Sequence, residues 1–168
     1  MRLVVVTAGG EGIARRVHEA VDAGAEVLVR ELSLPAGLPL DRVILHARIP
    51  GALGLATALH LSADMDVGQW RRQFSGLLSA SAHSAEEAAA KRAAGADTIF
   101  LAPIFASRHG RPPLGVEGLA GHVALGGCEP RHVAACRAAG AAGIAVLGGV
   151  WYAPGGIAAA VQRYRFCG

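Results

Sequence analysis

The sequence predicts an α/β fold, a (β/α)8 TIM barrel trimmed below its usual size, formed by a single domain over residues 1–168. Eight apolar segments have the length of strands. Three of these segments follow a helical run and a glycine, and their apolar residues are continuous, which is typical of parallel strands buried on both faces. Because barrels of this class start at about 200 residues, we expect helices to be missing. An open doubly wound sheet is the alternative.

Glycine marks the end of the helix in each of the three repeats. Gly24, Gly95 and Gly140 stand between the helical run and the strand, where a helix ends in the left-handed conformation that glycine adopts without steric cost. The repeats occupy residues 15–31, 86–103 and 131–149. This order of helix, glycine and buried strand indicates β/α units.

The other elements follow from apolar runs and from helix-start signals. Ser84 with Glu86 and Glu87 begins one helix, because acidic residues suit the first turn. Pro130 begins another, and Asp64 is expected to cap the helix that follows it. Strands are expected at 2–8, 25–32, 42–48, 58–62, 77–83, 97–104, 122–126 and 143–147. Helices are expected at 11–23, 64–74, 84–94, 129–139 and 155–165.

Two connections are too short for a regular barrel. Residues 33–41 contain Pro35 and Pro39, whereas a parallel crossover normally needs a dozen residues or more. The second helix is therefore expected to be missing, and the link from Leu114 to Gly121 has room only for a helical stub as the sixth helix. A barrel flank exposed by the missing helix would suit a homodimer.

Composition excludes several classes of protein. Hydrophobic residues make up 52% of the chain and charged residues 17%, which excludes intrinsic disorder. The net charge of +3 forms no long basic stripe, so no nucleic-acid partner is expected. No apolar run reaches the ~18 residues of a membrane span. Three cysteines without C-x-x-C spacing indicate neither a disulfide framework nor a zinc ribbon, and they fit a reduced cytoplasmic setting.

Ligands of α/β barrels bind at the carboxyl ends of the strands. Two glycine pairs, Gly126-Gly127 and Gly148-Gly149, follow the last two expected strands. In many barrels these two loops bind a phosphate through backbone N–H groups, and glycine lets the phosphate oxygens approach. The alternative is that the pairs are tight turns in a glycine-rich chain.

Two segments resemble a known family. They are SASAHSAEEAAAKRAAGADTIFLAPIFASRHGRPPLGVEGL at 79–119 and VALGGCEPRHVAACRAAGAAGIAVLGGV at 123–150. Both resemble the thiamine phosphate synthase and TenI (thiazole tautomerase) family, of which this chain would be a divergent, shortened member. The resemblance implies a (β/α)8 barrel that binds thiazole phosphate. The synthases of the family join that phosphate to a pyrimidine pyrophosphate with Mg²⁺.

The resemblance also implies roles for particular residues. The thiazole phosphate would bind backbone at Gly126, Gly127, Gly148 and Gly149. Arg30 matches the arginine that helps the synthases hold the pyrophosphate, and Ser81 matches the serine of the fifth strand. Arg108 or His109 stands where the synthases have a lysine in the sixth loop.

Departures from the family pattern disfavour Mg²⁺-dependent synthesis. The glutamine and lysine that flank the family arginine are Leu28 and Leu32, and the Asn-Asp pair after the third strand is His46-Ala47. Only Asp64 or Asp66 remains as a carboxylate ligand, and Mg²⁺ prefers oxygen ligands. No metal or other cofactor is therefore expected, except Mg²⁺ if synthase activity is retained.

Tautomerase activity requires fewer catalytic groups than Mg²⁺-dependent synthesis, because one histidine can move the proton while phosphate binding orients the ligand. The family places that histidine after the sixth strand, where this chain has Pro103. His109 and His46 are the catalytic candidates, whereas His60 and His83 are expected to support the barrel by hydrogen bonding. We expect a tautomerase-like or altered enzyme acting on a small phosphorylated heterocycle. The alternatives are a Mg²⁺-dependent synthase and a non-catalytic relative that binds a phosphate ligand or a partner.

Overall fold

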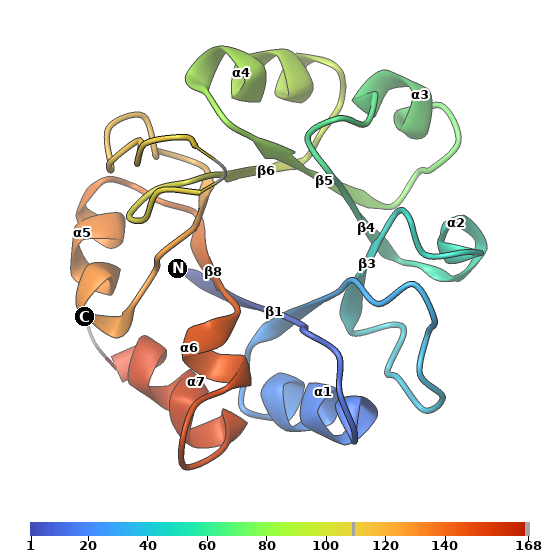
Figure 1. The fold of residues 1–168 in the computed structure, drawn as a ribbon. Coiled ribbons are helices and arrows are strands. Elements are labelled where there is room, and N and C mark those ends of the chain that lie inside the picture. The colour runs from blue at the N-terminus through green and yellow to red at the C-terminus, as the bar shows by residue number, and fades with distance from the viewer. Residues whose placement is uncertain (109, 167–168) are drawn as a thin grey trace.

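The fold is a closed barrel of parallel strands surrounded by helices (Figure 1). The computed structural model describes residues 1–108 and 110–166. Within these residues eight strands pair in sequence order, and β8 pairs with β1 to close the ring. The strands are β1 Arg2–Val6, β2 Glu26–Val29, β3 Val43–His46, β4 Ala58–Leu61, β5 Leu77–Ala82, β6 Thr98–Leu101, β7 Val123–Leu125 and β8 Gly143–Val146. The predicted barrel is confirmed, and the open sheet is excluded.

The helices cover the outside of the barrel. They are α1 Ile13–Asp22, α2 Ala52–Leu55, α3 Val67–Arg71, α4 Ala85–Ala93, the 3-10 turn η1 Pro130–His132, α5 Val133–Ala138, α6 Gly148–Trp151 and α7 Ile157–Phe166. The Ser84 hydroxyl caps α4 by accepting a hydrogen bond from the Glu87 N–H, as the sequence predicts. The short helices α2 and α6 were not expected. The cap of α3 is Asp66 rather than the predicted Asp64, which pairs with Arg48 instead.

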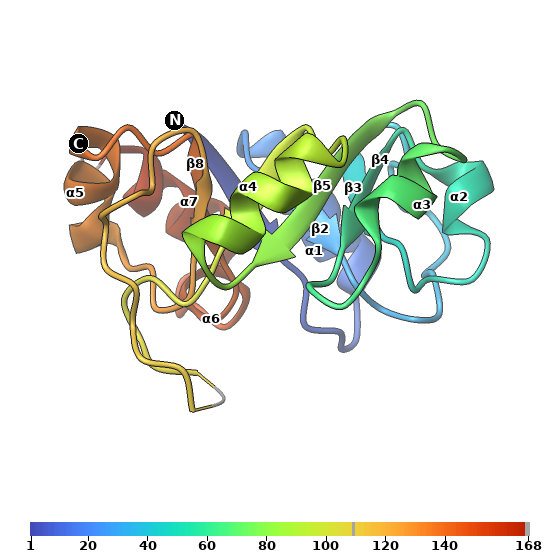
Figure 2. The same ribbon diagram turned by 90° about the horizontal axis from the view of Figure 1, so that it is seen from above.

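Both short connections lack a helix in the part of the chain that the structure describes. Between β2 and β3 the absence is as predicted. Between β6 and β7 the predicted stub is wrong, because only a turn forms there, with the Leu119 N–H donating to the Val116 carbonyl. The start of this segment is held by the preceding loop, because the Leu114 and Gly115 N–H groups donate to the Pro103 and Ile104 carbonyls. The residues before it form a hairpin, in which Arg108 and Arg111 exchange backbone hydrogen bonds. Figure 2 shows this hairpin projecting beyond the body of the barrel.

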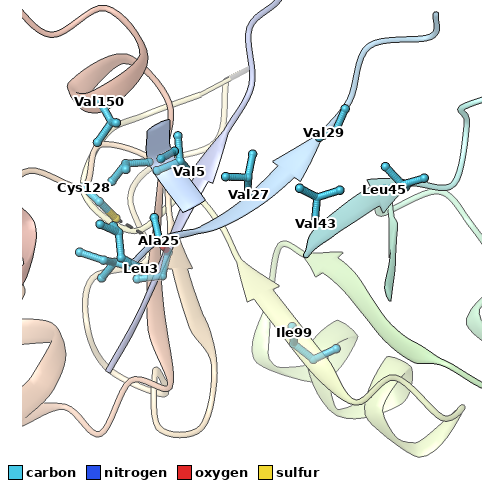
Figure 3. Close-up of a cluster of buried hydrophobic side chains, with 14 of the residues drawn as sticks. Leu3, Val5, Ala25, Val27, Val29, Val43, Leu45, Ile99, Cys128 and Val150 are labelled. Carbon is cyan, nitrogen blue, oxygen red and sulfur yellow. Dashed lines mark hydrogen bonds between the residues drawn. The ribbon is translucent and has the colours of Figure 1, made fainter. Parts of the chain in front are cut away.

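Strand side chains alternate between two apolar clusters. Val5, Val27 and Val43 belong to the larger cluster, which also contains helix residues such as Val17, so they face outward (Figure 3). The alternate residues Val4, Leu28, Ile44, Phe100, Val123 and Ala145 form a separate cluster within the barrel. Burial on both faces explains why the strands are continuous apolar runs in the sequence.

The link between β2 and β3 covers the flank that lacks a helix. The outward residues of β2 and β3, such as Val29 and Leu45, are fully buried. Leu34, Leu38 and Leu40 of the link pack against the same cluster. The flank therefore offers no bare apolar sheet, which removes the reason for expecting a homodimer there, and the dimer itself stays a prediction.

An ion pair lies at the amino-terminal end of the barrel. Arg2 donates from Nε and Nη2 to the two carboxylate oxygens of Glu26, at 2.6 and 2.5 Å, and from Nη1 to the Thr98 hydroxyl. This bidentate contact raises the pKa of Arg2. No helix among the described residues is long and apolar enough to cross a membrane.

Candidate ligand site at the mouth of the barrel

A cavity of about 420 Å³ opens at the carboxyl ends of the strands. Its size is within the range of small-molecule sites. Five of the predicted site residues line it, namely Arg30, His46, Ser81, Arg108 and Gly126. These residues follow β2, β6 and β7 or lie at the ends of β3 and β5, so the rule that ligands bind at strand ends located the site.

The other predicted residues are not part of this lining. Gly127, Gly148 and Gly149 are exposed near the mouth. His109 lies outside the described residues. Arg48 and Arg111 line the cavity although neither was predicted. The signals for them were present in the sequence, since Arg48 follows the third strand and Arg111 belongs to the one tight basic group of the chain.

Of the four glycines that follow β7 and β8, three stand where packing leaves no room for a Cβ atom. A Cβ at Gly127 would lie 2.6 Å from the Ala106 Cβ, and its φ of +74° disfavours other residues. A Cβ at Gly126 would lie 3.1 Å from the Pro103 Cα, and one at Gly149 would collide with the Tyr164 hydroxyl. At Gly148 an added Cβ would meet no atom within 4 Å among the described residues. Gly148 is thus the member of these pairs whose identity packing does not explain.

The lining carries strong positive charge. Among the described residues it contains four arginines and no carboxylate. The arginines are Arg30, Arg48, Arg108 and Arg111. Arginine binds phosphate with several N–H donors in a fixed geometry, so the cavity suits an anionic ligand.

Arg48 is positioned by two residues that follow β4. Its guanidinium donates to the Ser62 hydroxyl at 3.3 Å and to the Asp64 carboxylate at 2.5 Å. The hydrogen bonds from Ser62 and from Arg48 lower the pKa of Asp64 to about 2. Arg48 and Asp64 are both exposed, so the pair orients Arg48 at the rim and contributes little to stability.

The donor set does not fit Mg²⁺. Asp64 is engaged by Arg48 and Ser62, and Asp66 accepts from the Gln69 N–H at the start of α3. After β3 the side chains are those of His46 and Ala47, which offer no carboxylate. Within residues 1–108 and 110–166, no three His, Cys, Asp or Glu side chains gather in a group that could hold a metal ion.

His60 is buried inside the barrel. Its ring packs edge-on against Phe100, with the ring centroids 4.7 Å apart, and its nitrogens hydrogen-bond to the Ser79 and Ser81 hydroxyls at 2.9 Å each. Burial, followed by the neighbouring His46, lowers the pKa of His60 to about 3. The expected supporting role of His60 is confirmed, and it fixes the Ser81 hydroxyl at the cavity floor.

His46, at the end of β3, and His83, directly after β5, both line the cavity. The Nδ1 of His46 accepts the Arg48 N–H at 3.1 Å, and burial, then Arg48 and Arg30, lower the pKa of His46. The Nδ1 of His83 bonds to the Ala102 carbonyl at 2.8 Å. His83 thus holds the end of β6, as expected, and its ring also lines the cavity, at one of the strand ends where ligands of such barrels bind.

The loop after β6 is fastened to the loop after β7. The Phe105 ring stacks on His132 with 3.9 Å between centroids, and the Phe105 N–H donates to the Gly126 carbonyl at 2.9 Å. The same loop carries Arg108 and Arg111. These contacts therefore set the position of two arginines of the cavity.

The fold and the cavity define a (β/α)8 barrel whose mouth is lined by arginines. The family model described as "Thiamine monophosphate synthase" matches residues 42–150. A thiamine-phosphate synthase of Chloroflexus aurantiacus is 36% identical over 148 residues, which cover 80% of this chain and 67% of that protein. The chain belongs to the thiamine monophosphate synthase/TenI family.

Solved structures show the same fold. The thiamine phosphate pyrophosphorylase of Pyrococcus furiosus superposes with a TM-score of 0.81 at 22% identity, covering 99% of this chain and 94% of that one. The corresponding protein of Bacteroides thetaiotaomicron gives a TM-score of 0.71 at 20% identity, with coverages of 99% and 95%. A 3-hexulose-6-phosphate synthase gives 0.73 at 15% identity, with 99% of both chains covered.

Proposed function

We propose that this chain binds a thiazole phosphate at the mouth of the barrel and catalyses a metal-independent proton transfer on it, as a TenI-like tautomerase. The observation that carries the proposal is the composition of the cavity. Four arginines line it together with histidines and serines, and the lining includes no carboxylate among the described residues. Such a site suits anion binding and proton transfer better than Mg²⁺ coordination.

Phosphate binding is supported by the positions of the arginines and of Gly148. The guanidinium of Arg48 is already oriented by Asp64, so little side-chain freedom is lost when it binds a ligand. Gly148 begins the four-residue helix α6, in which the Val150 and Trp151 N–H groups donate to the Leu147 carbonyl, so only the N–H groups of Gly148 and Gly149 are left without a partner within the helix. Its missing side chain leaves room for a phosphate oxygen to approach.

Proton transfer is supported by the hydrogen-bonded histidines and serine of the cavity. A tautomerase removes a proton from one atom of the ring and returns it to another, while phosphate binding holds the ring in place. Pro103 stands where the tautomerases of the family have their histidine, so another group must accept the proton here.

Mg²⁺-dependent thiamine phosphate synthesis is the second candidate. It is favoured by the relative of 36% identity that is named a thiamine-phosphate synthase. The side chains of Asp64 and Asp66 count against it, because both carboxylates are engaged by other groups. Synthesis would require Asp64 to release Arg48 before it could bind the ion.

Thermal unfolding with a panel of ligands tests the proposal. The panel is thiazole phosphate, its carboxylated precursor, thiamine phosphate and inorganic phosphate, each with and without Mg²⁺. A ligand that binds the folded state stabilises it by about 2.7 kcal/mol at a hundredfold excess over its dissociation constant. We expect stabilisation by a thiazole ligand without Mg²⁺ and a weaker effect of phosphate alone.

Turnover then separates the candidate functions. A tautomerase converts its ligand equally well with Mg²⁺ and with a chelator, whereas a synthase stops when the chelator is added. A non-catalytic relative binds the ligand and converts nothing. No stabilisation by any member of the panel would overturn the proposed function.

A further inference from the structure

The proton positions of the cavity histidines follow from their hydrogen-bond partners. A carbonyl oxygen can only accept a hydrogen bond, and a backbone N–H can only donate one. Each neutral imidazole has one N–H and one lone pair. A partner of known type at one nitrogen therefore decides what the other nitrogen can do.

His46 can only donate to a ligand in its neutral form. Its Nδ1 lone pair accepts the Arg48 N–H at 3.1 Å, so the proton is on Nε2. The positive charges of Arg48 and Arg30, together with burial, favour this neutral form by lowering the pKa of His46. His46 thus offers the cavity an N–H donor and no free lone pair.

His60 and Ser81 form a closed relay. The Ser79 hydroxyl donates to the Leu59 carbonyl at 3.1 Å, so it must accept the hydrogen bond from Nδ1 of His60. The Nε2 of His60 is then the acceptor, and the Ser81 hydroxyl is its donor. His60 has no lone pair left for a ligand, and the proton of Ser81 is already used.

His83 is the exception among these three. Its Nδ1 lies 2.8 Å from the Ala102 carbonyl, and that contact requires an N–H on Nδ1. The lone pair is therefore on Nε2, and no hydrogen bond among the described residues engages that nitrogen. Of the described histidines that line the cavity, His83 is the one able to accept a proton.

The backbone holds the His83 ring in this state. The His83 N–H donates to the Glu87 carboxylate at 2.8 Å, and Ser84 begins α4 directly after it. Glu87 is in turn 3.5 Å from Lys91, whose ammonium donates to the Ala63 carbonyl. The backbone of His83 is thus held by Glu87, and its ring is held by the Ala102 carbonyl. A proton-transfer group requires a fixed position of this kind.

We propose that Nε2 of His83 is the general base of this site and that Nε2–H of His46 donates a hydrogen bond to the ligand atom that gains negative charge. The inference rests on the proposed function. His83 removes a proton from the ring of the phosphorylated heterocycle and becomes an imidazolium, while the electron pair stays on the ligand. The same proton then returns to a different ring atom, which restores neutral His83, so no co-reactant is consumed.

Nitrogen NMR of the histidine side chains tests the proton positions without any turnover. We expect the N–H on Nδ1 for His83 and on Nε2 for His46, with the signals assigned by the His83→Asn and His46→Asn variants. An N–H on Nε2 of His83 with a bare Nδ1 would overturn the proposal, whatever the protein's reaction is.

Kinetics of His83→Asn test the catalytic role. Asparagine can still donate to the Ala102 carbonyl, but it has no basic nitrogen. We expect kcat for the thiazole phosphate to fall about a hundredfold or more, because general-base catalysis is worth about 10²–10⁴-fold. The dissociation constant of that ligand, measured by calorimetry, should change by less than about threefold. A kcat within about threefold of the parent protein would overturn the proposal.

Two further variants complete the test. His83→Ala should lose the same activity and regain part of it with added imidazole, which a purely structural defect would not allow. His18→Asn, at an exposed histidine of α1, should leave kcat unchanged. If the parent protein neither binds nor converts the thiazole ligands, the proposed function fails, and the NMR result alone decides whether His83 is the proton acceptor.

Discussion

The glycines that follow β7 and β8 differ in whether their surroundings leave room for a side chain. Gly148→Ala places a methyl group in open space at a backbone without positive φ. We expect the free energy of unfolding to stay within about 0.5 kcal/mol of the parent value. We expect the affinity for inorganic phosphate and for thiazole phosphate to fall severalfold, because the methyl group blocks the approach of phosphate oxygens.

Gly149→Ala is the matched variant. Its methyl group would collide with the Tyr164 hydroxyl, which donates to the Cys128 carbonyl. Overpacking of this kind costs about 1–3 kcal/mol of unfolding free energy. Denaturant titration measures the free energy of unfolding of both variants, and calorimetry measures their affinity for phosphate. Unchanged phosphate affinity in Gly148→Ala would show that this backbone does not touch the phosphate.

Arg48 is expected to bind the ligand and to add little to stability. In Arg48→Gln the affinity for thiazole phosphate should fall about tenfold or more, since a charged hydrogen bond contributes about 1.5–3 kcal/mol. The pair with Asp64 is exposed and contributes little to stability, so the melting temperature should barely move. Arg42→Gln removes a comparable exposed pair with Asp22 outside the cavity lining, and it should change neither quantity. Equal affinities in the two variants would contradict an arginine-lined phosphate site.

The buried His60 makes stability depend on pH. Its pKa is about 3 in the folded protein and about 6.5 when unfolded, so the unfolded chain binds a proton first. The stability is fully present above about pH 6.5 and is lost as the pH falls toward 3. Between pH 7 and pH 5 the loss should be about 2 kcal/mol, a window above the range in which ordinary carboxylates titrate.

The His60→Asn variant isolates the contribution of His60 to the pH dependence of stability. Denaturant unfolding at pH 7 and at pH 5 should show a loss smaller by about 2 kcal/mol in this variant than in the parent. His18→Asn, at the surface, should keep the parent difference. A His60→Asn protein with the parent's pH dependence would mean that His60 takes up its proton in the folded state.

At the scale of elements, the hairpin after β6 depends on one stacked pair. Loss of the Phe105 stack on His132 in Phe105→Leu should release the hairpin that carries Arg108 and Arg111. A double-mutant cycle with His132→Asn should give a coupling of about 0.5–1.5 kcal/mol. Hydrogen exchange at the Arg108 and Arg111 N–H groups, each of which donates to the carbonyl of the other residue, should quicken in Phe105→Leu. Unchanged exchange would show that the stack does not hold the hairpin.

The elements predictable from sequence are those with local signals. Ser84 with two glutamates located α4, and continuous apolar runs located every strand, although each strand ends earlier than predicted. The stub between β6 and β7 was wrong because the hairpin depends on contacts between Leu114 and Pro103, which local patterns do not show. The cap of α3 was wrong because Asp64 is bound by Arg48, a residue distant in sequence.

The location of the site was predictable from the sequence, but the roles of its residues were predictable only in part. Strand ends selected Arg30, His46 and Ser81, and all three line the cavity. The acceptor role of His83 could not be predicted, because it depends on a hydrogen bond from His83, which follows β5, to the Ala102 carbonyl, which follows the neighbouring strand β6. Only the folded barrel brings these groups together.

At the scale of the whole molecule, the barrel keeps the family's architecture in a short chain. The link between β2 and β3 replaces a helix with leucines that bury the flank, so closure of the barrel does not require that helix. The shortening therefore leaves the mouth intact, and its lining carries arginines and histidines and, among the described residues, no carboxylate.

The most direct test of this account is turnover of the carboxylated thiazole phosphate tautomer, followed by proton NMR, with a chelator and with Mg²⁺ in parallel samples. The account predicts the same rate of isomerisation in both samples and loss of that rate in His83→Asn. No isomerisation in either sample, together with Mg²⁺-dependent condensation of thiazole phosphate with a pyrimidine pyrophosphate, would contradict it.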